Sequence, residues 1–502
     1  MALSSRTHRL LESTALAGLF ALAYAQAPLF SSNQFQYMLH GMARAGLGAL
    51  RGDWLANTTD PTPLFSLLVE AVFRLTGAPW LFYVFFALLA GTYLLALLSV
   101  LETAFGPYPS RAARLAAAAG LIATHAGLVR AGLIRLLGQE AAFLFDGGVA
   151  GQRLLGTVFQ PSLFGVLLLA GLALALRGRP VWGAVLSAAV AAVHPTYLLP
   201  AALTTAAICL STWVRTGRGL SMLAPAAAAL AVALPTALFV WFGFQGASPQ
   251  TAAEARSLLV NFRIPHHAVI AQWLNWTVWV KLGLTALALW ATRRSAAVFT
   301  ALGVLSLTAT TLTMAQAAFG SDLTALLFPW RVSTLVVPLA TAILVDRAAR
   351  AVTAGLRPDP RLLWAGIVLM GLSGLAITLH NAREEAARPE QAVIRWARAS
   401  SRPGDVYLTP IQMENFRLGA LQPAYVDFLA IPYAPEDVKT WYLRIHGALK
   451  VYDLLDCKSL EDVRSDGGVS RALLPAGPTL ECPGWSETYR DAAYRVLEHP
   501  VK

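Results

Sequence analysis

Charged residues are scarce in this chain, and their scarcity limits what the protein can be. Only 13% of the 502 residues are Asp, Glu, Lys or Arg, whereas 56% are hydrophobic and the mean hydropathy is +0.55. A typical soluble domain carries about 25% charged residues. The composition therefore excludes most soluble multidomain enzymes and predicts a membrane protein.

Two further absences narrow the function. The sequence has no Walker A loop, so ATP hydrolysis is not indicated. It also has no convincing repeat between its halves, whereas transporters of this size tend to show one. Transport is accordingly a weaker hypothesis than an enzyme or a scaffold.

The positive charge is unevenly distributed. Residues 1–380 hold 24 basic and 11 acidic residues, and the remaining residues hold 15 and 17. Most arginines of the first part stand in short clusters between apolar runs, for example Arg111 and Arg114. Basic residues that recognise nucleic acid gather on one solvated face instead. We therefore expect no nucleic-acid partner and interpret the clusters as a topology signal.

About eleven apolar runs could cross the bilayer, since about 20 residues span its core. They lie near residues 10–30, 78–101, 112–129, 158–176, 181–193, 197–214, 220–243, 274–292, 296–319, 325–345 and 362–380. The fifth run is too short to span comfortably, and we expect it to be tilted or joined to the sixth around His194 and Pro195.

Placing the arginine clusters inside the cell gives a cytoplasmic N-terminus. An odd number of crossings then puts everything after His380 on the outer face, which is the periplasm in a Gram-negative cell. The expected location is the bacterial cytoplasmic (inner) membrane, with several passes. An alternative for the first run is a cleavable signal peptide ending near Ala23-Tyr24-Ala25.

Composition changes again at Asn381, where a small α/β domain is expected over residues 381–502. Helices are predicted at 389–399 and 435–455, the second with Trp441 on its buried face, and strands at 405–410 and 424–427. Cys457 and Cys482 lie in a compartment that permits oxidation, and the sequence leaves their pairing open. The predicted fold is thus an all-α polytopic membrane domain, residues 1–380, followed by an extracytoplasmic α/β domain.

Chemistry is expected in three long outer loops, residues 31–77, 130–157 and 243–275. The first begins with an amphipathic stretch that predicts an interfacial helix, with Gln36 and His40 on its polar side. It continues through Asp53, Asn57 and Asp60 to two prolines, which suits a rigid site. The alternative is structural, with Asp60 capping a helix and Asp53 solvated.

At this loop the chain resembles the GT-C superfamily of polytopic glycosyltransferases, nearest to its aminoarabinose and protein O-mannosyl transferase branch. The resemblance rests on Asn33-Gln34-Phe-Gln-Tyr37, a helix, Gly52-Asp53-Trp54 and Asp60-Pro61-Thr-Pro63-Leu64, in that order. It implies a polyprenyl-phosphate sugar donor and an extracytoplasmic glycan, lipid or protein acceptor, with Asn33, Gln34, Tyr37 and Asn57 lining the substrate cavity.

The chain departs from the family where an acid pair is expected, because Asn33 and Gln34 stand there. An amide cannot take a proton from an acceptor hydroxyl at neutral pH. Asp60 is the first candidate for the catalytic base and Asp53 the second. The departure also keeps open a noncatalytic GT-C-like scaffold of envelope glycan assembly.

The second loop offers two more carboxylates, Glu140 and Asp146. Either could supply a second carboxylate for the donor site or for a divalent metal site. If residues 133–145 form a surface helix, both are instead simply solvated.

Donor phosphate is expected at arginines and histidines from later in the chain. Arg263 with His266 or His267 suits a phosphate, because guanidinium gives bidentate contacts; the alternative is an interfacial anchor that binds lipid phosphate nonspecifically. Adjacent histidines should point apart, which argues against a shared metal. The resemblance implies that Arg331 also meets the phosphate and that His194 lines the donor cavity. All these residues are expected to converge on one outer pocket.

Overall fold

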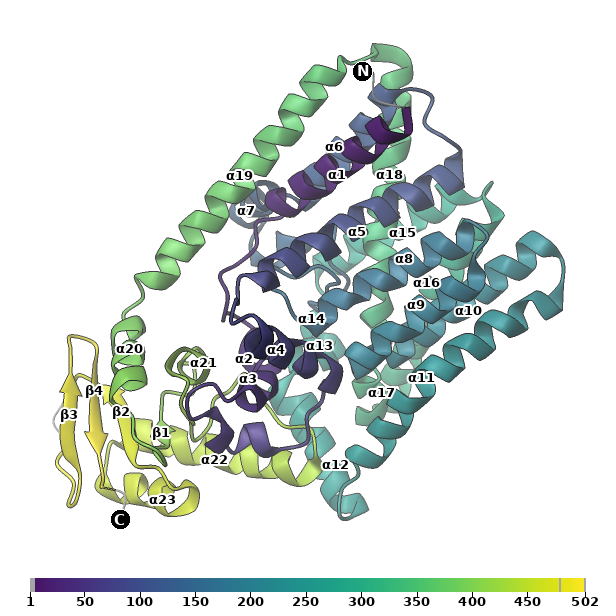
Figure 1. The fold of residues 1–502 in the computed structure, drawn as a ribbon. Coiled ribbons are helices and arrows are strands. Elements are labelled where there is room, and N and C mark those ends of the chain that lie inside the picture. The colour runs from purple at the N-terminus through teal and green to yellow at the C-terminus, as the bar shows by residue number, and fades with distance from the viewer. Residues whose placement is uncertain (1–4, 478–479, 501–502) are drawn as a thin grey trace. The chain divides into compact units, whose positions relative to one another are not determined.

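The computed structural model describes residues 5–477 and 480–500, which form two compact units (Figure 1). Unit 1 comprises residues 5–27, 80–240 and 264–380. Unit 2 comprises residues 28–79, 241–263, 381–477 and 480–500. One boundary between the two units falls after residue 380, where the sequence predicts a domain boundary. Unit 2 also takes in the first outer loop and part of the third.

Unit 1 is helical, and each of the eleven predicted spans contains a helix. In chain order these are α1 (Ser5–Ala23), α5 (Leu81–Phe105), α6 (Arg111–His125), α8 (Val166–Leu176), α9 (Pro180–Val193), α10 (Leu198–Thr216), α11 (Leu223–Gly243), α15 (Trp276–Thr292), α16 (Ala296–Phe319), α18 (Ser333–Leu356) and α19 (Pro360–Ala386). The last residues of α11 and α19 belong to unit 2.

Six helical segments of the described chain are long and apolar enough to cross a membrane, at Leu81–Phe105, Pro195–Thr216, Gly219–Gly243, Ala296–Phe319, Asp322–Leu356 and Pro360–Ala386. A seventh is the pair α6 and α7 (Gly127–Leu137), which is bent by 50°. The chain therefore has the helices of a polytopic membrane protein, and the count of eleven crossings stays a prediction.

The fifth predicted span remains a short helix of its own. Helix α9 ends at Val193, and extended backbone at His194 (φ −141°, ψ 98°) separates it from α10. Figure 1 shows α8, α9 and α10 side by side. Glycines let α8 and α9 pack closely, because a Cβ on Gly171 would lie 2.5 Å from the carbonyl oxygen of Gly183.

Unit 2 combines three sequence stretches. The first loop gives α2 (Gln34–Tyr37), α3 (Leu39–Ala45) and α4 (Pro63–Leu75), and the third gives α12 (Pro249–Ser257). The C-terminal stretch gives α20 (Glu390–Ser400), α21 (Phe416–Ala420), α22 (Pro435–Leu454), α23 (Cys457–Gly467) and the strands β1 (Tyr407–Leu408), β2 (Arg471–Pro475), β3 (Ser486–Arg490) and β4 (Tyr494–Glu498).

The four strands form one sheet in the order β1-β2-β4-β3, with β1 parallel to β2 and the other pairs antiparallel. The predicted helices at 389–399 and 435–455 and the strand at 405–410 are confirmed. The strand predicted at 424–427 is wrong, since Ala424 makes only an isolated bridge to Tyr407. The side chains after Ala424 face a charged cluster rather than the sheet.

The core of unit 2 lies between α20 and the sheet. Val393, Ile394, Tyr407, Phe416 and Val496 are at most 3% exposed. Trp441 of α22 is fully buried, as its helical spacing predicts.

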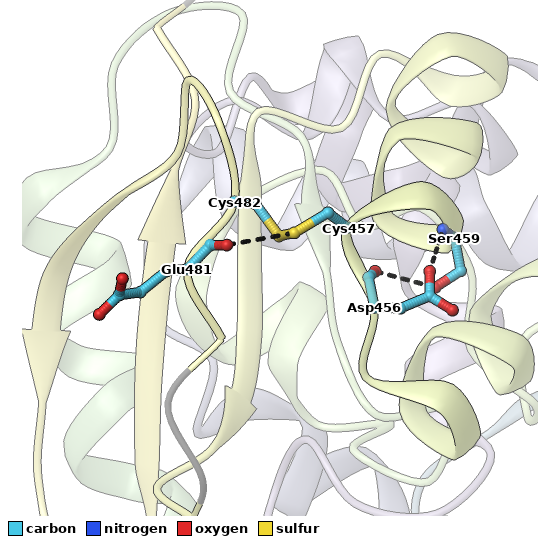
Figure 2. Close-up of a disulfide and its surroundings, with 5 residues drawn as sticks. All are labelled: Asp456, Cys457, Ser459, Glu481 and Cys482. Carbon is cyan, nitrogen blue, oxygen red and sulfur yellow. Dashed lines mark hydrogen bonds between the residues drawn. A yellow bond between two sulfur atoms is a disulfide. The ribbon is translucent and has the colours of Figure 1, made fainter.

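Cys457 and Cys482 form a disulfide, which settles the pairing that the sequence leaves open (Figure 2). The bond joins the start of α23 to the segment before β3 and closes a loop of 25 residues. Cys209, in α10, is a free, buried thiol.

We predict that replacing both Cys457 and Cys482 with serine destabilises unit 2 by about 3 kcal/mol, because the unfolded chain regains the entropy of that loop. Limited proteolysis of the full-length protein during heating, scored for cleavage beyond residue 381, measures the change. Cys209→Ser, which leaves the loop closed, is the control. Equal cleavage temperatures for wild type and the double variant would contradict the prediction.

Candidate functional site

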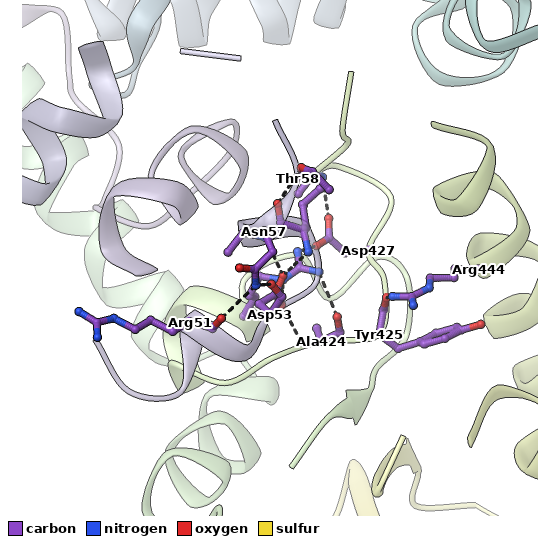
Figure 3. Close-up of polar contacts among 12 residues, drawn as sticks. Arg51, Asp53, Asn57, Thr58, Ala424, Tyr425, Asp427 and Arg444 are labelled. Carbon is purple, nitrogen blue, oxygen red and sulfur yellow. Dashed lines mark hydrogen bonds and ion pairs between the residues drawn. The ribbon is translucent and has the colours of Figure 1, made fainter. Parts of the chain in front are cut away.

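A buried ion cluster in unit 2 joins the first outer loop to the C-terminal stretch (Figure 3). Arg417 of α21 is 2% exposed and donates through Nε to Asp53 Oδ2 at 2.7 Å. Its Nη1 donates to Asp427 Oδ2. Asp53 and Asp427 are themselves 0% and 2% exposed. One guanidinium therefore neutralises two buried carboxylates that are far apart in sequence.

Asp53 has no oxygen left for chemistry in this arrangement. Its Oδ1 accepts the N–H groups of Leu55 and Ala56, and its Oδ2 accepts the N–H of Ala424 in addition to Arg417. Asn57 supports the same turn, since its Nδ2 donates to the carbonyl oxygens of Arg51 and Asp53. The Gly-Asp-Trp segment thus has the contacts of a structural anchor, not of a solvated acid.

Asp60 is buried, with 7% exposure, and both of its carboxylate oxygens also have partners. Its Oδ2 pairs with Arg44 Nη2 at 2.7 Å, and its Oδ1 accepts the N–H of Thr62 just before α4. Arg44 is 42% exposed at its side chain, so the pair opens toward solvent on one side. Burial lowers the pKa of the neighbouring His40, against the opposing pull of Asp60.

The predicted interfacial helix differs in the structure. Two short helices, α2 and α3, replace it, and Gln36 and His40 are buried at 8% and 6% exposure instead of facing water. Both side chains find partners: Gln36 Nε2 donates to Tyr433 Oη of the C-terminal stretch at 2.8 Å, and His40 bonds to the backbone of Ala56.

At the start of α2, Gln34 is buried and its Oε1 accepts the N–H of Phe30 at 2.7 Å. Asn33 and Tyr37 on either side are partly exposed. The amide of Gln34 thus closes a turn, while its two predicted companions in the substrate cavity keep accessible surface.

A second charged group lies near the ion cluster. Burial, together with the Asp427 carboxylate, raises the pKa of Glu414 to about 7, and Arg263 opposes that shift. Arg263 is 8% exposed, donates through Nη2 to the Leu429 carbonyl oxygen at 2.6 Å and lies over the Phe428 ring. Its Nε has no partner among the described residues.

In unit 1, a glycine-rich loop over residues 146–153 is held by hydrogen bonds from polar side chains of other segments. Side chains from several helices bind its backbone or its flank: Lys281 Nζ to Gly148 O (2.8 Å), His267 Nδ1 to Ala150 O (2.6 Å), Ser333 Oγ to Val149 N (2.9 Å) and Thr341 Oγ1 to Phe145 O (2.7 Å). The loop is therefore held in one place by α15, α13 (Pro265–Ala268) and α18.

The two acids of the second outer loop have different environments. Glu140 lies on a short 3₁₀ helix (Gln139–Phe143) and is exposed, as the solvated alternative predicts. Asp146 is 4% exposed, and its Oδ2 lies 3.1 Å from the Tyr24 hydroxyl. Of the two acids, Asp146 is therefore the buried one with a polar side-chain partner, as a binding-site residue would be.

Beside the 146–153 loop lies an apolar pocket of about 330 Å³, which α14 (Ile270–Trp273), α15, α16, the 3₁₀ turn Pro329–Val332 and α18 enclose. Trp273, Trp279 and Trp330 contribute to its wall, and Lys281 is its only charged lining residue. Sequence reasoning missed Lys281, although a single lysine inside the apolar run 274–292 is the signal that finds it.

Arg331 sits in the chain between two wall residues of this pocket, Trp330 and Ser333. It is 8% exposed and donates through Nη1 to Thr196 Oγ1 at 2.6 Å. Its Nε has no partner among the described residues. His194, 3% exposed, packs its ring against Tyr197, over which the Arg331 guanidinium also lies. Arg331 and His194 therefore share one neighbourhood.

His266 and His267 lie in unit 1, whereas Arg263 belongs to unit 2. The two rings lie against each other with centroids 4.1 Å apart, so the expectation that they point apart is wrong; the tight four-residue helix α13 crowds them. Burial and the adjacent His266 lower the pKa of His267 to about 3, and Arg331 and Arg153 act in the same direction. His267 is thus a neutral donor near two guanidiniums.

Among residues 5–477 and 480–500 no three His, Cys, Asp or Glu side chains are grouped as a metal ion would need. Convergence of Asp60, in unit 2, with Arg331, in unit 1, stays a prediction.

We predict that Arg417→Met destabilises unit 2 by about 3–5 kcal/mol, because two buried carboxylates lose their counter-ion. Thermal unfolding of the purified protein measures the loss. Arg464→Gln, at an exposed pair with Glu461, should leave the unfolding temperature nearly unchanged, because solvent screens that pair. Adding Asp53→Asn and Asp427→Asn to Arg417→Met should recover part of the loss; no recovery would contradict the role of charge.

We predict that Glu414 makes unit 2 less stable as pH rises. Its folded pKa of about 7 exceeds its ordinary value of 4.5, so the folded state holds a proton that the unfolded state has released between these values. Stability should fall by up to about 1.4 kcal/mol per pH unit in this window and level off above pH 7. Unfolding midpoints measured from pH 5 to 8 test this, and Glu414→Gln should flatten the profile. A profile unchanged by Glu414→Gln would refute the assignment.

Comparison with known proteins finds a family model that matches part of the chain and a similar fold over 99% of it. The family described as "Domain of unknown function (DUF6798)" matches residues 388–448, which run from the start of α20 into α22. That stretch holds Arg417, Asp427 and Trp441. A search of curated proteins finds no match.

Among solved structures, ArnT from Cupriavidus metallidurans bound to undecaprenyl phosphate matches with a TM-score of 0.51 and 13% identity, covering 99% of each chain. The apo state of the same ArnT gives a TM-score of 0.45 over 99% of each chain, and the archaeal oligosaccharyltransferase AglB from Archaeoglobus fulgidus gives 0.44 over 94% of this chain and 70% of its own, both at 13% identity. The likeness in fold rests on the first of these. The chain therefore shares the fold of this ArnT over 99% of its length.

Proposed function

We propose that this protein is an integral membrane glycosyltransferase that moves a sugar from a polyprenyl-phosphate-linked donor to an extracytoplasmic glycan, lipid or protein. The observation that carries the proposal is the agreement in fold with ArnT over 99% of both chains. That ArnT structure is bound to undecaprenyl phosphate. The proposed location is the bacterial inner membrane, with the N-terminus cytoplasmic and residues 381–502 in the periplasm.

The donor lipid is assigned to unit 1. The apolar pocket of about 330 Å³ suits an isoprenoid chain, which offers no hydrogen-bonding groups. Lys281 supplies a positive charge in its wall, and the unpartnered Nε of Arg331 supplies a donor next to it in the chain. Cations at this depth are costly unless they meet an anion, and a lipid-linked phosphate is such an anion.

Stabilising the leaving group is the chemical task of these cations. Displacement at the anomeric carbon breaks its bond to the phosphate oxygen, and polyprenyl phosphate leaves with the negative charge. Fixed guanidinium and ammonium groups lower the free energy of that charge in the transition state. His267 is neutral at working pH and donates its single N–H, on Nδ1, to the Ala150 carbonyl oxygen, so it holds the 146–153 loop and adds no charge.

Asp60 remains the proposed base, and Asp53 is reassigned to structure because all its hydrogen-bonding capacity is used. To accept a proton, the Asp60 carboxylate must exchange its contact with Arg44 for the acceptor hydroxyl. Asp146 is proposed as the second carboxylate, which contacts the sugar. No step through a metal is proposed.

A noncatalytic scaffold is the second candidate, and one observation favours it. Asn33 and Gln34 stand where the resemblance to the GT-C superfamily implies acids, and Gln34 is committed to the turn at Phe30. A scaffold of this kind would bind the lipid without turning it over. Binding and transfer therefore have to be measured separately.

We predict that binding and transfer respond to different variants. Undecaprenyl phosphate binding to purified protein, followed by native mass spectrometry, should weaken at least about tenfold in Lys281→Met and in Arg331→Gln, because each removes a charge contact worth about 1.5–3 kcal/mol. Arg293→Gln, at an arginine that lies over the Trp290 ring, should leave binding unchanged. Unweakened binding in both test variants would overturn the donor site.

Transfer is tested in the host cell by deleting the gene and comparing envelope glycolipids and glycans by mass spectrometry. A sugar modification that disappears should return with wild type and with Asp462→Asn, at an exposed pair with Lys450. It should not return with Asp60→Asn, which keeps an acceptor for the Thr62 N–H but loses the base. Full restoration by Asp60→Asn would remove Asp60 as the base and favour the scaffold.

A further inference from the structure

Unit 1 has a second concentration of charge where α1 begins, around the link between α5 and α6 (Figure 1). Six arginines face three carboxylates there: Arg9, Arg111, Arg114, Arg177, Arg347 and Arg350 against Glu12, Glu102 and Asp346. In a chain with 13% charged residues, this excess of positive charge is large.

All three carboxylates form ion pairs with arginines of this group. Glu12, with its side chain 8% exposed, accepts from Arg111 Nε at 2.6 Å and from Arg114 Nη1 at 2.8 Å. Glu102 pairs with Arg177 at 3.3 Å, and the buried Asp346 pairs with Arg350 at 2.8 Å. Each of the three acids is therefore already in an ion pair with at least one arginine.

Two arginines remain without a carboxylate. Within residues 5–477 and 480–500, neither Arg9 nor Arg347 has an ion-pair partner; Arg347 lies over the Phe105 ring instead. The arginines therefore exceed what the protein's own acids satisfy, and the surplus calls for an external anion.

These groups surround a real hollow. It has a volume of about 400 Å³, and Arg9, Arg111, Arg114, Ser110 and Tyr108 contribute to its lining. Arg111 is 53% exposed at its side chain, so its guanidinium can make a second contact while it stays paired with Glu12. Guanidinium, hydroxyl and phenol groups are donors that fit the oxygens of a phosphate group.

The surface next to the hollow is apolar. Leu10 and Leu11 follow Arg9 directly in α1 and are 68% and 54% exposed. A free anion would gain nothing from these leucines, whereas a phospholipid presents acyl chains immediately beside its phosphate. Basic pockets between membrane helices bind anionic head groups in this way.

We propose that this hollow binds the phosphate head group of an anionic phospholipid from the leaflet at which α1 begins. The bound lipid neutralises Arg9 and Arg111 and lays its chains along Leu10 and Leu11. The site lies at the opposite end of α1 from Tyr24, which contacts the 146–153 loop, and it does not depend on the proposed transfer reaction.

The proposal is tested with full-length protein in nanodiscs of phosphatidylcholine, with or without phosphatidylglycerol. Phosphatidylglycerol should raise the unfolding midpoint of the wild type by at least about 2 °C, and native mass spectrometry should show it retained after mild delipidation. Arg9→Gln, which breaks no ion pair, should lose most of that shift, as should Arg347→Gln to a smaller degree.

The matched control is Arg294→Gln, which removes the same charge from another loop between helices of unit 1. Comparing each variant with and without phosphatidylglycerol cancels any loss of stability from the substitution itself. An equal shift in Arg9→Gln and the control would overturn the proposal, because the effect would then be nonspecific. Inorganic phosphate that reproduces the shift would also overturn it, since the site would then bind a free anion.

Discussion

Arg417 is the residue on which the organisation of unit 2 depends. Two buried carboxylates, Asp53 and Asp427, would each cost several kcal/mol without a counter-ion, and a single guanidinium satisfies both. Burial raises the pKa of Asp427, and Arg417 acts against that shift. The pair also fixes the Gly-Asp-Trp turn, and with it the first outer loop, to the C-terminal stretch. Residues that the sequence places in a membrane loop thus become part of a folded unit.

Unit 1 uses its few charges differently. The loop over residues 146–153 contains three glycines, and polar side chains from the surrounding helices hold its backbone. Lys281 is the clearest example, because it is buried, contacts a carbonyl oxygen and lines an apolar pocket. Long-range contacts of this kind keep the polar groups of the loop backbone satisfied beside an apolar pocket.

Much of the fold could be predicted from the sequence. Runs of apolar residues predicted eleven helices of unit 1, although not the shorter ones such as α7, α13 and α14, and the helical spacing of Val438, Trp441 and Ile445 predicted α22. The hairpin of β3 and β4 was missed because β3 is exposed and polar, so it lacks the alternation that marks a half-buried strand. Helical spacing correctly buried Trp441. Amphipathic spacing failed for α2 and α3, because Gln36 finds a partner 397 residues away and His40 bonds to the backbone of Ala56.

The candidate site was less predictable for the same reason. Motif order pointed to Asp53 and Asp60, but whether a carboxylate is free or fully bonded depends on tertiary contacts such as Arg417 and Arg44. Asp146 and Glu140 are close in sequence and similar in chemistry, and only the fold separates the buried acid from the exposed one. Lys281 was overlooked although its position in an apolar run distinguishes it.

The separation of 364 residues between Asp53 and Arg417 has a consequence for biosynthesis. At about 5–20 residues per second, a ribosome needs roughly 20 to 70 s to deliver the partner of a carboxylate it has already released. During that interval the early loop is unfinished and its acid stays hydrated. Nascent chains that stop before Arg417 would leave this loop unfolded, which gives quality-control proteases a mark of incomplete synthesis.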